Sequence, residues 1–188
     1  MTTTVYTVGH STRTLEDFVD LLGSVAIETL IDVRTIAKSR HNPQYGEGEL
    51  SAGLADAVIG YRRMPGLGGL RHTTKASVNQ GWENHSFRGY ADYMQTPEFT
   101  ENLHELIRVA GTARTVIMCA EAVPWRCHRS LIGDALTIRG ISVIDLIAMG
   151  KPRAHRLTSF AHVDGDTITY PGNAAGMPVS ASPPRRTP

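Results

Sequence analysis

Two short runs of almost uninterrupted apolar residues, at 29–33 and 115–119, limit the possible folds more than any other feature of the sequence. Strands of this composition are buried on both faces, as in parallel sheets that helices cover on each side. Stretches with helical spacing of apolar residues lie between such runs, for example Leu15, Phe18 and Leu22. This alternation predicts an α/β fold, a single three-layer domain with a mainly parallel sheet flanked by helices.

The pattern of apolar residues, glycines and prolines also predicts the individual elements. Strands are expected at 5–8, 29–33, 61–64, 115–119 and 141–147. Helices are expected at 14–22, 50–58, 90–94, 97–110 and 127–139, the last one ended by Gly140. A hairpin is expected to pair 161–163 with 167–170. The segments 34–49 and 65–89 are expected to be loops, and the second is long enough to be an ordered functional loop or lid.

The chain of 188 residues is long enough for one substantial core. Hydrophobic residues make up 41% and charged residues 20%, as is typical of a globular domain. We expect this domain to span 1–172. The remaining segment, 173–188, is rich in proline, serine and alanine, and we expect it to be disordered.

The formal net charge of +1 gives the protein no field of one sign, so composition favours neither nucleic acid nor a membrane as a partner. No apolar run approaches the length of a membrane span, and residues 1–5 do not resemble a signal peptide. We therefore expect a cytoplasmic protein whose two cysteines are reduced. The sequence leaves the oligomeric state open.

Polar and sulfur-bearing side chains follow several of the predicted strands. His10, Arg34 and Cys119 each lie at or just beyond the carboxyl end of a strand. Ligands of parallel sheets bind beyond these ends. The convergence predicts a functional site at this edge of the sheet, built around the segment 119–129, Cys-Ala-Glu-Ala-Val-Pro-Trp-Arg-Cys-His-Arg.

Four residues of this segment are candidates for catalysis. Cys127 is expected in the first turn of a helix, where unpaired N–H groups and the helix dipole favour a thiolate. Cys119 ends a buried strand and is either a second reactive thiol or an ordinary core residue. His128 is a candidate for substrate orientation or proton transfer. Glu121 is either a general base or the ion-pair partner of an arginine.

A further set of residues is predicted to bind substrate. Arginine side chains suit phosphate, sulfate or carboxylate groups, and aromatic rings suit a stacked base or ring. Intramolecular ion pairs and ordinary core packing are the alternatives. The predicted stacking wall consists of Tyr90, Tyr93 and Trp125. The full predicted set is His10, Arg34, Arg40, Asn42, Arg88, Tyr90, Trp125 and Arg129.

The same cysteines and histidines allow a metal site as an alternative. Cys119, Cys127, His128 and His10 offer two sulfur and two imidazole ligands for zinc or iron, although their spacing differs from the short cysteine pairs of structural zinc sites. No phosphate-binding glycine loop, dinucleotide-binding fingerprint or zinc-protease helix motif occurs in the sequence. We therefore predict no cofactor and keep a bound metal as the alternative.

Five ordered blocks resemble the signature segments of the domain-of-unknown-function 488 family. The resemblance covers about residues 5–172 and departs from the family at Ala37, where proline is frequent. It implies a shared fold and pocket, and no particular reaction. The blocks are Thr7-Val-Gly-His-Ser11, Asp32-Val-Arg34 followed by Ser39-Arg-His-Asn-Pro43, Leu67-Gly-Gly69, the stretch from Phe87 to Met94, and the stretch from Cys119 to Arg129.

A weaker likeness links the chain to rhodanese-type sulfurtransferases. Residues 30–34 are similar to their early strand motif, and the strand, loop and helix after Met118 are similar to their active-site segment. The loop is longer here and carries a second cysteine. The likeness implies a loosely rhodanese-like, anion-binding architecture and assigns no reaction.

These features lead to four functional hypotheses. The first is an enzyme that uses a cysteine thiolate for group transfer or hydrolysis on a small anionic or nucleotide-like substrate. The second is a protein that binds or processes nucleic acid through its arginines and aromatic rings. The third is a metal-dependent enzyme with cysteine and histidine ligands, and the fourth is a ligand-binding module without chemistry.

Overall fold

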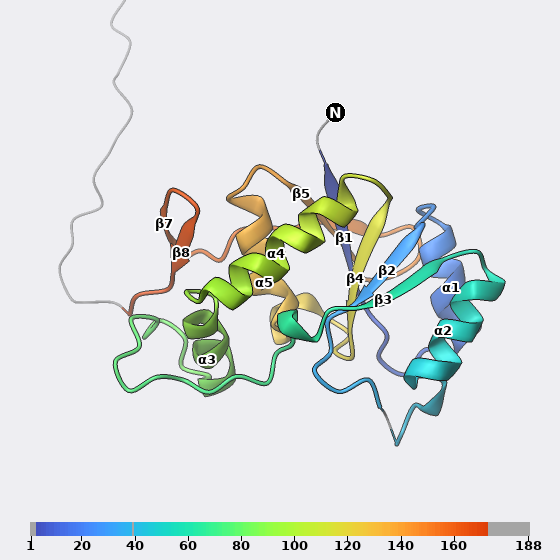
Figure 1. Cartoon of the computed structure of the whole chain (residues 1–188), viewed down its shortest axis with the longest axis horizontal. Coiled ribbons are helices and arrows are strands. Elements are labelled where there is room, and N and C mark those ends of the chain that lie inside the picture. Colours follow the sequence, from blue (N-terminus) through green and yellow to red (C-terminus); the bar gives the residue numbers. More distant parts are fainter. Residues whose placement is uncertain (1–2, 39, 173–188) are drawn as a thin grey trace, which may run out of the picture.

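The computed structural model describes residues 3–38 and 40–172, and the segment 173–188, which the sequence predicts to be disordered, lies outside the described residues. Within the described part, six strands form one sheet in the order β3-β2-β4-β1-β5-β6 (Figure 1). Neighbouring strands are parallel, except that β6 is antiparallel to β5. The strands are β1 Thr4–Gly9, β2 Thr29–Asp32, β3 Gly60–Arg63, β4 Thr115–Cys119, β5 Ser142–Leu146 and β6 Pro152–Ala154.

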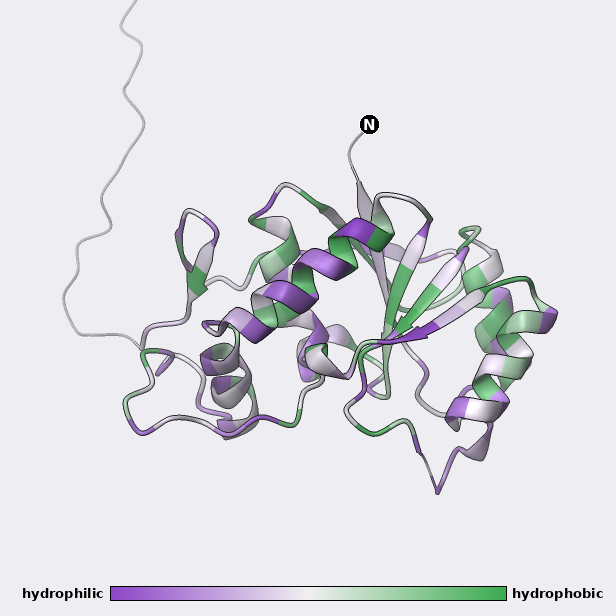
Figure 2. Ribbon diagram, viewed as in Figure 1, coloured by the Kyte–Doolittle hydropathy of each residue, from purple (hydrophilic) through white to green (hydrophobic). Residues whose placement is uncertain are grey.

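Helices cover both faces of the sheet, which confirms the predicted three-layer α/β arrangement (Figure 1). One face packs against α1 and α2 through a core that includes Phe18, Leu30 and Met118. The other face packs against α3, α4 and α5 through a core that includes Leu103 and Ile117. Figure 2 shows this division as hydrophobic central strands beneath helices with polar outer surfaces. The helices are α1 Leu15–Gly23, α2 Glu47–Asp56, α3 His85–Tyr93, α4 Pro97–Ala110 and α5 Arg129–Thr137.

The side chains of strand β4 alternate between the two faces of the sheet. Successive side chains of a strand point to opposite faces. Val116 and Met118 therefore pack under α1 and α2, whereas Ile117 and Cys119 pack under the helices of the other face. Because β4 lies between β1 and β2, Cys119 ends a strand that is buried along its whole length.

Several elements differ from those that the sequence predicts. Helix α2 begins at Glu47, three residues earlier than predicted. Helix α3 begins at His85 rather than at Tyr90, because the side chain of Asn84 accepts hydrogen bonds from N–H groups of the first turn. Helix α5 begins at Arg129, two residues later than predicted. Strand β6 is additional, and its exposed residues carry no apolar alternation that reveals a strand in advance.

The predicted C-terminal hairpin is confirmed. Strand β7, His162–Asp164, pairs antiparallel with β8, Thr167–Thr169. Gly165 in the turn has a φ of 56°, a backbone conformation that glycine adopts without strain. Ile168 of β8 is buried against the core under α5, so the hairpin is attached to the domain.

The long connection before α3 is ordered by one carboxylate, that of Asp92. Its Oδ2 accepts hydrogen bonds from Thr73 and Thr74, and its Oδ1 accepts hydrogen bonds from Ser77 and Asn79. Burial opposes the charged form, but these hydrogen bonds outweigh it and lower the pKa of Asp92. The connection is thereby held as a defined loop on the surface of α3.

A buried polar network joins α5 to the C-terminal part of the chain. Asp134 is fully buried and accepts hydrogen bonds from Nε2 of His155 at 2.9 Å and from the hydroxyl of Tyr170 at 2.8 Å. The backbone N–H of Thr158 donates to the same carboxylate at 3.1 Å, and Asp145 lies 3.6 Å from Nδ1 of the imidazole. Burial opposes a charged imidazole, but the two carboxylates outweigh it and raise the pKa of His155 to about 9.

Replacing Asp134 with alanine is expected to lower the free energy of unfolding by about 3–5 kcal/mol, because His155 loses its buried acceptor. The pKa of His155 lies above its ordinary value of 6.5 in the folded state, so its stabilising contribution is complete below that pH and is lost as the pH rises through about 9. Urea unfolding of wild type and variant across this pH window measures both effects. The exposed Asp164→Ala is the control, expected to change stability by less than about 0.5 kcal/mol. Equal losses in the two variants would contradict the network.

Candidate active site

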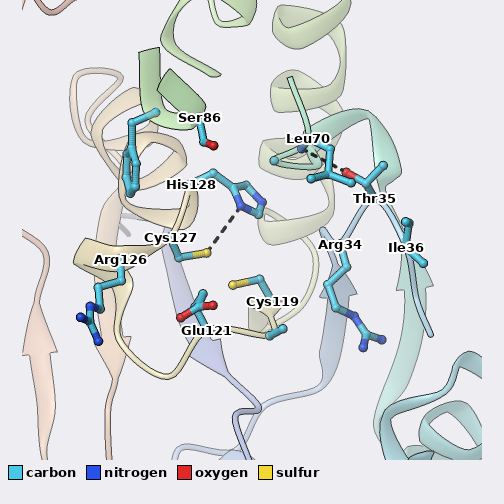
Figure 3. Close-up of a pocket in the computed structure, with 13 residues that line it drawn as sticks. Arg34, Thr35, Ile36, Leu70, Ser86, Cys119, Glu121, Arg126, Cys127 and His128 are labelled. Carbon is cyan, nitrogen blue, oxygen red and sulfur yellow. Dashed lines mark hydrogen bonds between the residues drawn. The ribbon is translucent and has the colours of Figure 1, made fainter. Parts of the chain in front are cut away.

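A pocket of about 390 Å³ opens at the carboxyl ends of β2 and β4 (Figure 3). The segment between β4 and α5 forms one wall, the residues after β2 form another, and the start of α3 contributes a third. Inside it, the sulfur atoms of Cys119 and Cys127 point toward one another (Figure 3). The site therefore combines two thiols from opposite ends of one loop.

Cys127 lies between a short 3-10 helix, Pro124–Arg126, and α5, rather than in the first helical turn as the sequence predicts. His128 occupies the N-cap position, but its side chain makes no capping hydrogen bond. Instead, the backbone N–H of Arg129 donates to the sulfur of Cys127 at 3.5 Å. The sulfur thus takes the place of a capping oxygen at the positive end of the helix, an environment that stabilises a thiolate.

The two thiols interact directly, and their environments are unequal. At Cys127, burial raises the pKa, but the hydrogen bonds from Cys119 and His128 and the charge of Arg129 together hold the pKa well below its ordinary value. At Cys119, burial and the neighbouring Cys127 raise the pKa well above its ordinary value. Of the two sulfurs, the surroundings of Cys127 are thus the ones that favour a thiolate.

Arg129 is the buried cation of the site, with 1% of its surface exposed. Its side chain donates a hydrogen bond to the carbonyl of Glu121 at 2.7 Å, which holds the loop over the sheet. Gly9 is required beneath this contact, because a Cβ there would collide with the same carbonyl. Arg129 lies below the loop and is not among the residues that line this pocket, and its contact with substrate stays a prediction.

The ring of His128 lies between the sulfur of Cys127 and the backbone of a glycine. It packs so closely on Gly69 that a Cβ there would come within 2.8 Å of the imidazole Cγ. Its Nδ1 lies 3.5 Å from the sulfur of Cys127. Its Nε2 is buried and has no hydrogen-bond partner among the described residues. This nitrogen therefore lacks the partner that a buried polar atom ordinarily has.

His10 and Arg34 line a second, more polar pocket of about 340 Å³, to which Asn42 also contributes. Arg34 is paired with Asp32 at 2.6 Å, and its NH1 lies 3.4 Å from Nε2 of His10. His10 stacks on Tyr45 at 4.0 Å, on the face of the sheet that α1 and α2 cover. Burial lowers the pKa of His10 to about 4, so its imidazole is neutral at neutral pH. The guanidinium of Arg34 points away from the thiols (Figure 3).

The predicted stacking wall does not form. Tyr90 is fully buried in the core, where its hydroxyl donates to the carbonyl of Leu67 at 2.8 Å. Tyr93 is buried beside it. Trp125 is 56% exposed, near Arg153, and borders a different pocket on the side of the C-terminal segment. Core packing accounts for the two tyrosines, and no aromatic wall of these residues faces the thiols.

Two of the predicted arginines lie away from the thiols. Arg88 donates two hydrogen bonds to the carbonyl of Trp82 and so stabilises the loop before α3. Arg40 is exposed on the loop after β2 and lines neither of the pockets described above. Neither side chain lines the pocket that holds the two thiols.

The sequence does not reveal the apolar side of the pocket. Ile36, Leu70 and Phe87 line it, and Ile36 and Leu70 are 61% and 69% exposed. Single exposed apolar residues are ordinary until a fold gathers them, and these come from three separate segments. Arg126 also lines the pocket and is exposed, and its guanidinium points away from the two sulfurs (Figure 3).

The described residues do not form a ligand set for the alternative of a metal site. Among residues 3–38 and 40–172, no three histidine, cysteine, aspartate or glutamate side chains come together as possible ligands of one ion. The four suggested ligands are divided by the sheet, because His10 packs with Tyr45 on one face and Cys119 joins the core of the other.

Comparison with known families agrees with the blocks noted in the sequence. A family model described as Domain of unknown function DUF488 matches residues 14–136. The chain belongs to the DUF488 family. The matched part carries both cysteines and His128 of the candidate site. No curated protein and no solved structure matches the chain. None of the helices in the described ranges is long and apolar enough to pass through a bilayer.

Gly69→Ala is expected to slow the alkylation of Cys127 near neutral pH by roughly three- to tenfold. The new Cβ displaces the ring of His128, and the thiol loses a contact that lowers its pKa. Peptide mass spectrometry over a series of pH values measures the rate. Gly48→Ala in α2 is the matched control, since a Cβ there meets nothing within 4 Å. An unchanged rate in Gly69→Ala would show that His128 does not support the thiolate.

Proposed function

We propose that this member of the DUF488 family is an enzyme that uses the thiolate of Cys127 for group transfer or hydrolysis on a small anionic substrate with an apolar part. One observation carries the proposal. The sulfur of Cys127 accepts the N–H of Arg129 and lies 3.5 Å from Nδ1 of His128, inside an open pocket. Because the thiolate is the nucleophilic form of cysteine, this environment favours reaction at the sulfur.

In the proposed reaction, the sulfur of Cys127 attacks the electrophilic atom of the substrate and forms a covalent bond to the transferred group. The bond to the leaving group breaks, its electron pair departs with that group, and a protonated His128 supplies the proton that this group takes up. Water or an acceptor then attacks the intermediate, releases the thiolate and gives up one proton. Glu121, exposed on the pocket wall, accepts this proton and passes it to the imidazole of His128.

The size and lining of the pocket support a small substrate. Its volume of about 390 Å³ lies in the range of small-molecule sites, roughly 300–1,000 Å³. Ile36, Leu70 and Phe87 offer contacts to an apolar part, and Arg126 at the rim suits a carboxylate, sulfate or phosphate. The apolar wall and the cationic rim on either side of the Cys127 sulfur are the reasons for proposing a small anionic substrate with an apolar part.

Binding or processing of nucleic acid has less support. Tyr90 is buried and Trp125 borders another pocket, so these rings do not provide a stacking surface beside the thiols. The net charge of +1 also counts against strong binding of a duplex. No observation among the described residues favours this function over cysteine chemistry.

Iodoacetamide is expected to modify Cys127 faster than Cys119, with an apparent pKa at Cys127 well below the free-thiol value of about 8.5. Peptide mass spectrometry reads the two cysteines separately across the pH series. Cys127→Ser should remove the fast reaction. Cys119→Ser is the matched variant and should retain it, because the serine hydroxyl can still donate a hydrogen bond to the thiolate. Slow reaction at both cysteines of the wild type would contradict the proposal.

A further inference from the structure

In the reaction proposed above, the second thiol of the pocket serves only as a hydrogen-bond donor to the first. A nucleophile needs a hydrogen-bond donor at its side, and a hydroxyl or an amide would serve. Cys119 instead brings a second sulfur, held at the end of β4 with 2% of its surface exposed, directly beside Cys127. The two sulfurs face each other within one pocket (Figure 3). This arrangement allows sulfur–sulfur chemistry that a single thiol cannot complete.

We propose that Cys127 and Cys119 form a dithiol couple that reduces small disulfides with an anionic, aromatic or apolar substituent, Cys127 as the attacking thiol and Cys119 as the resolving thiol. The proposal rests on the proposed function in one respect, that Cys127 is the nucleophile. It adds a substrate class, disulfides, and a covalent role for Cys119, which serves only as a hydrogen-bond donor in the first reaction.

The two steps balance as follows. The thiolate of Cys127 attacks one sulfur of the substrate disulfide, the substrate S–S bond breaks, and the electron pair leaves with the other sulfur as a thiolate, which takes up a proton. Cys119 then loses its proton and attacks the sulfur of Cys127. The mixed disulfide breaks and the second thiol leaves with that proton. The substrate gains two electrons and two protons, and the two cysteines are oxidised to one disulfide.

The order of the steps follows from the surroundings of each sulfur. Cys127 reacts first because it accepts the N–H of Arg129 and adjoins His128. Burial is the main reason that the pKa of Cys119 is raised, and the negative charge of Cys127 is a further reason. Once Cys127 is bound in a mixed disulfide, this charge is gone, while the positive charge of Arg129 and the backbone N–H of Glu121 still favour a thiolate at Cys119. The first step therefore prepares the second.

The pocket wall indicates which disulfides fit. Ile36 and Leu70 expose apolar surface at the mouth, Phe87 presents a ring, and Arg126 carries a positive charge at the rim. An aromatic disulfide with carboxylate groups matches these features. Dithiobis(nitrobenzoate) has this chemistry, and each released nitrothiobenzoate is measured by its absorbance, so it serves as the probe.

The test adds the probe in less than one molar equivalent to the whole, fully reduced chain, and follows released thiolate together with the mass of the protein. Wild type is expected to release two thiolates for each probe molecule consumed, and to lose two hydrogens without keeping an adduct. Cys119→Ser is expected to release one and to keep the other half of the probe on Cys127. Cys127→Ser is expected to react at least tenfold more slowly.

The outcomes separate the two proposals. One thiolate per probe and a lasting adduct in wild type, as in Cys119→Ser, would overturn the dithiol couple and leave Cys127 as a nucleophile. If wild type and Cys119→Ser both react no faster than Cys127→Ser, the dithiol couple and the nucleophilic role of Cys127 would both be overturned. Cys119→Ala is a second variant, and a thermal unfolding curve shows whether each variant is folded. If a folded Cys119→Ala also releases one thiolate for each probe molecule, the loss of the second release is due to the missing thiol and not to a change of fold.

Discussion

The buried guanidinium of Arg129 is the interaction on which the site depends. A cation with 1% of its surface exposed requires compensating partners, because burial of an unpaired charge is costly. Its partners are the carbonyl of Glu121, which fixes the loop, and the sulfur atoms of Cys119 and Cys127. Burial by itself disfavours the charge of Arg129, and the nearby sulfurs reverse this and raise its pKa. The proposed thiolate and this guanidinium stabilise each other, and Gly9 leaves room for the loop that joins them.

Helix α5 connects this charge pair to the rest of the domain. Its first N–H donates to the sulfur of Cys127, and one turn later Asp134 holds His155 and Tyr170 in the buried network. The same helix thus positions the nucleophile at its start and is itself positioned by polar contacts in its middle. Stability and site geometry are coupled through this helix, so changes in the C-terminal segment are expected to alter the loop as well as the fold.

Local patterns in the sequence are sufficient for the order of elements and for the edge of the sheet that carries the pocket, because apolar strands and helical spacing are local properties. They do not determine which face a side chain reaches: His10 and Cys119 both end strands, yet they lie on opposite faces. Long-range contacts decide the rest. Arg129 is an internal support instead of a surface ligand, and the early start of α3 puts Phe87 beside the pocket and Tyr90 in the core. Neither placement has a signature within its own segment.

The proposed reaction requires one thiolate at neutral pH, on the sulfur of Cys127. The ultraviolet absorbance of the thiolate, followed as the pH of the metal-free, reduced chain is raised, measures this without any substrate or alkylating agent. We expect one step well below about pH 8.5, absent from Cys127→Ser and retained in Cys119→Ser. A wild-type curve with no step below that pH would contradict the charge pair with Arg129 and the nucleophile built upon it.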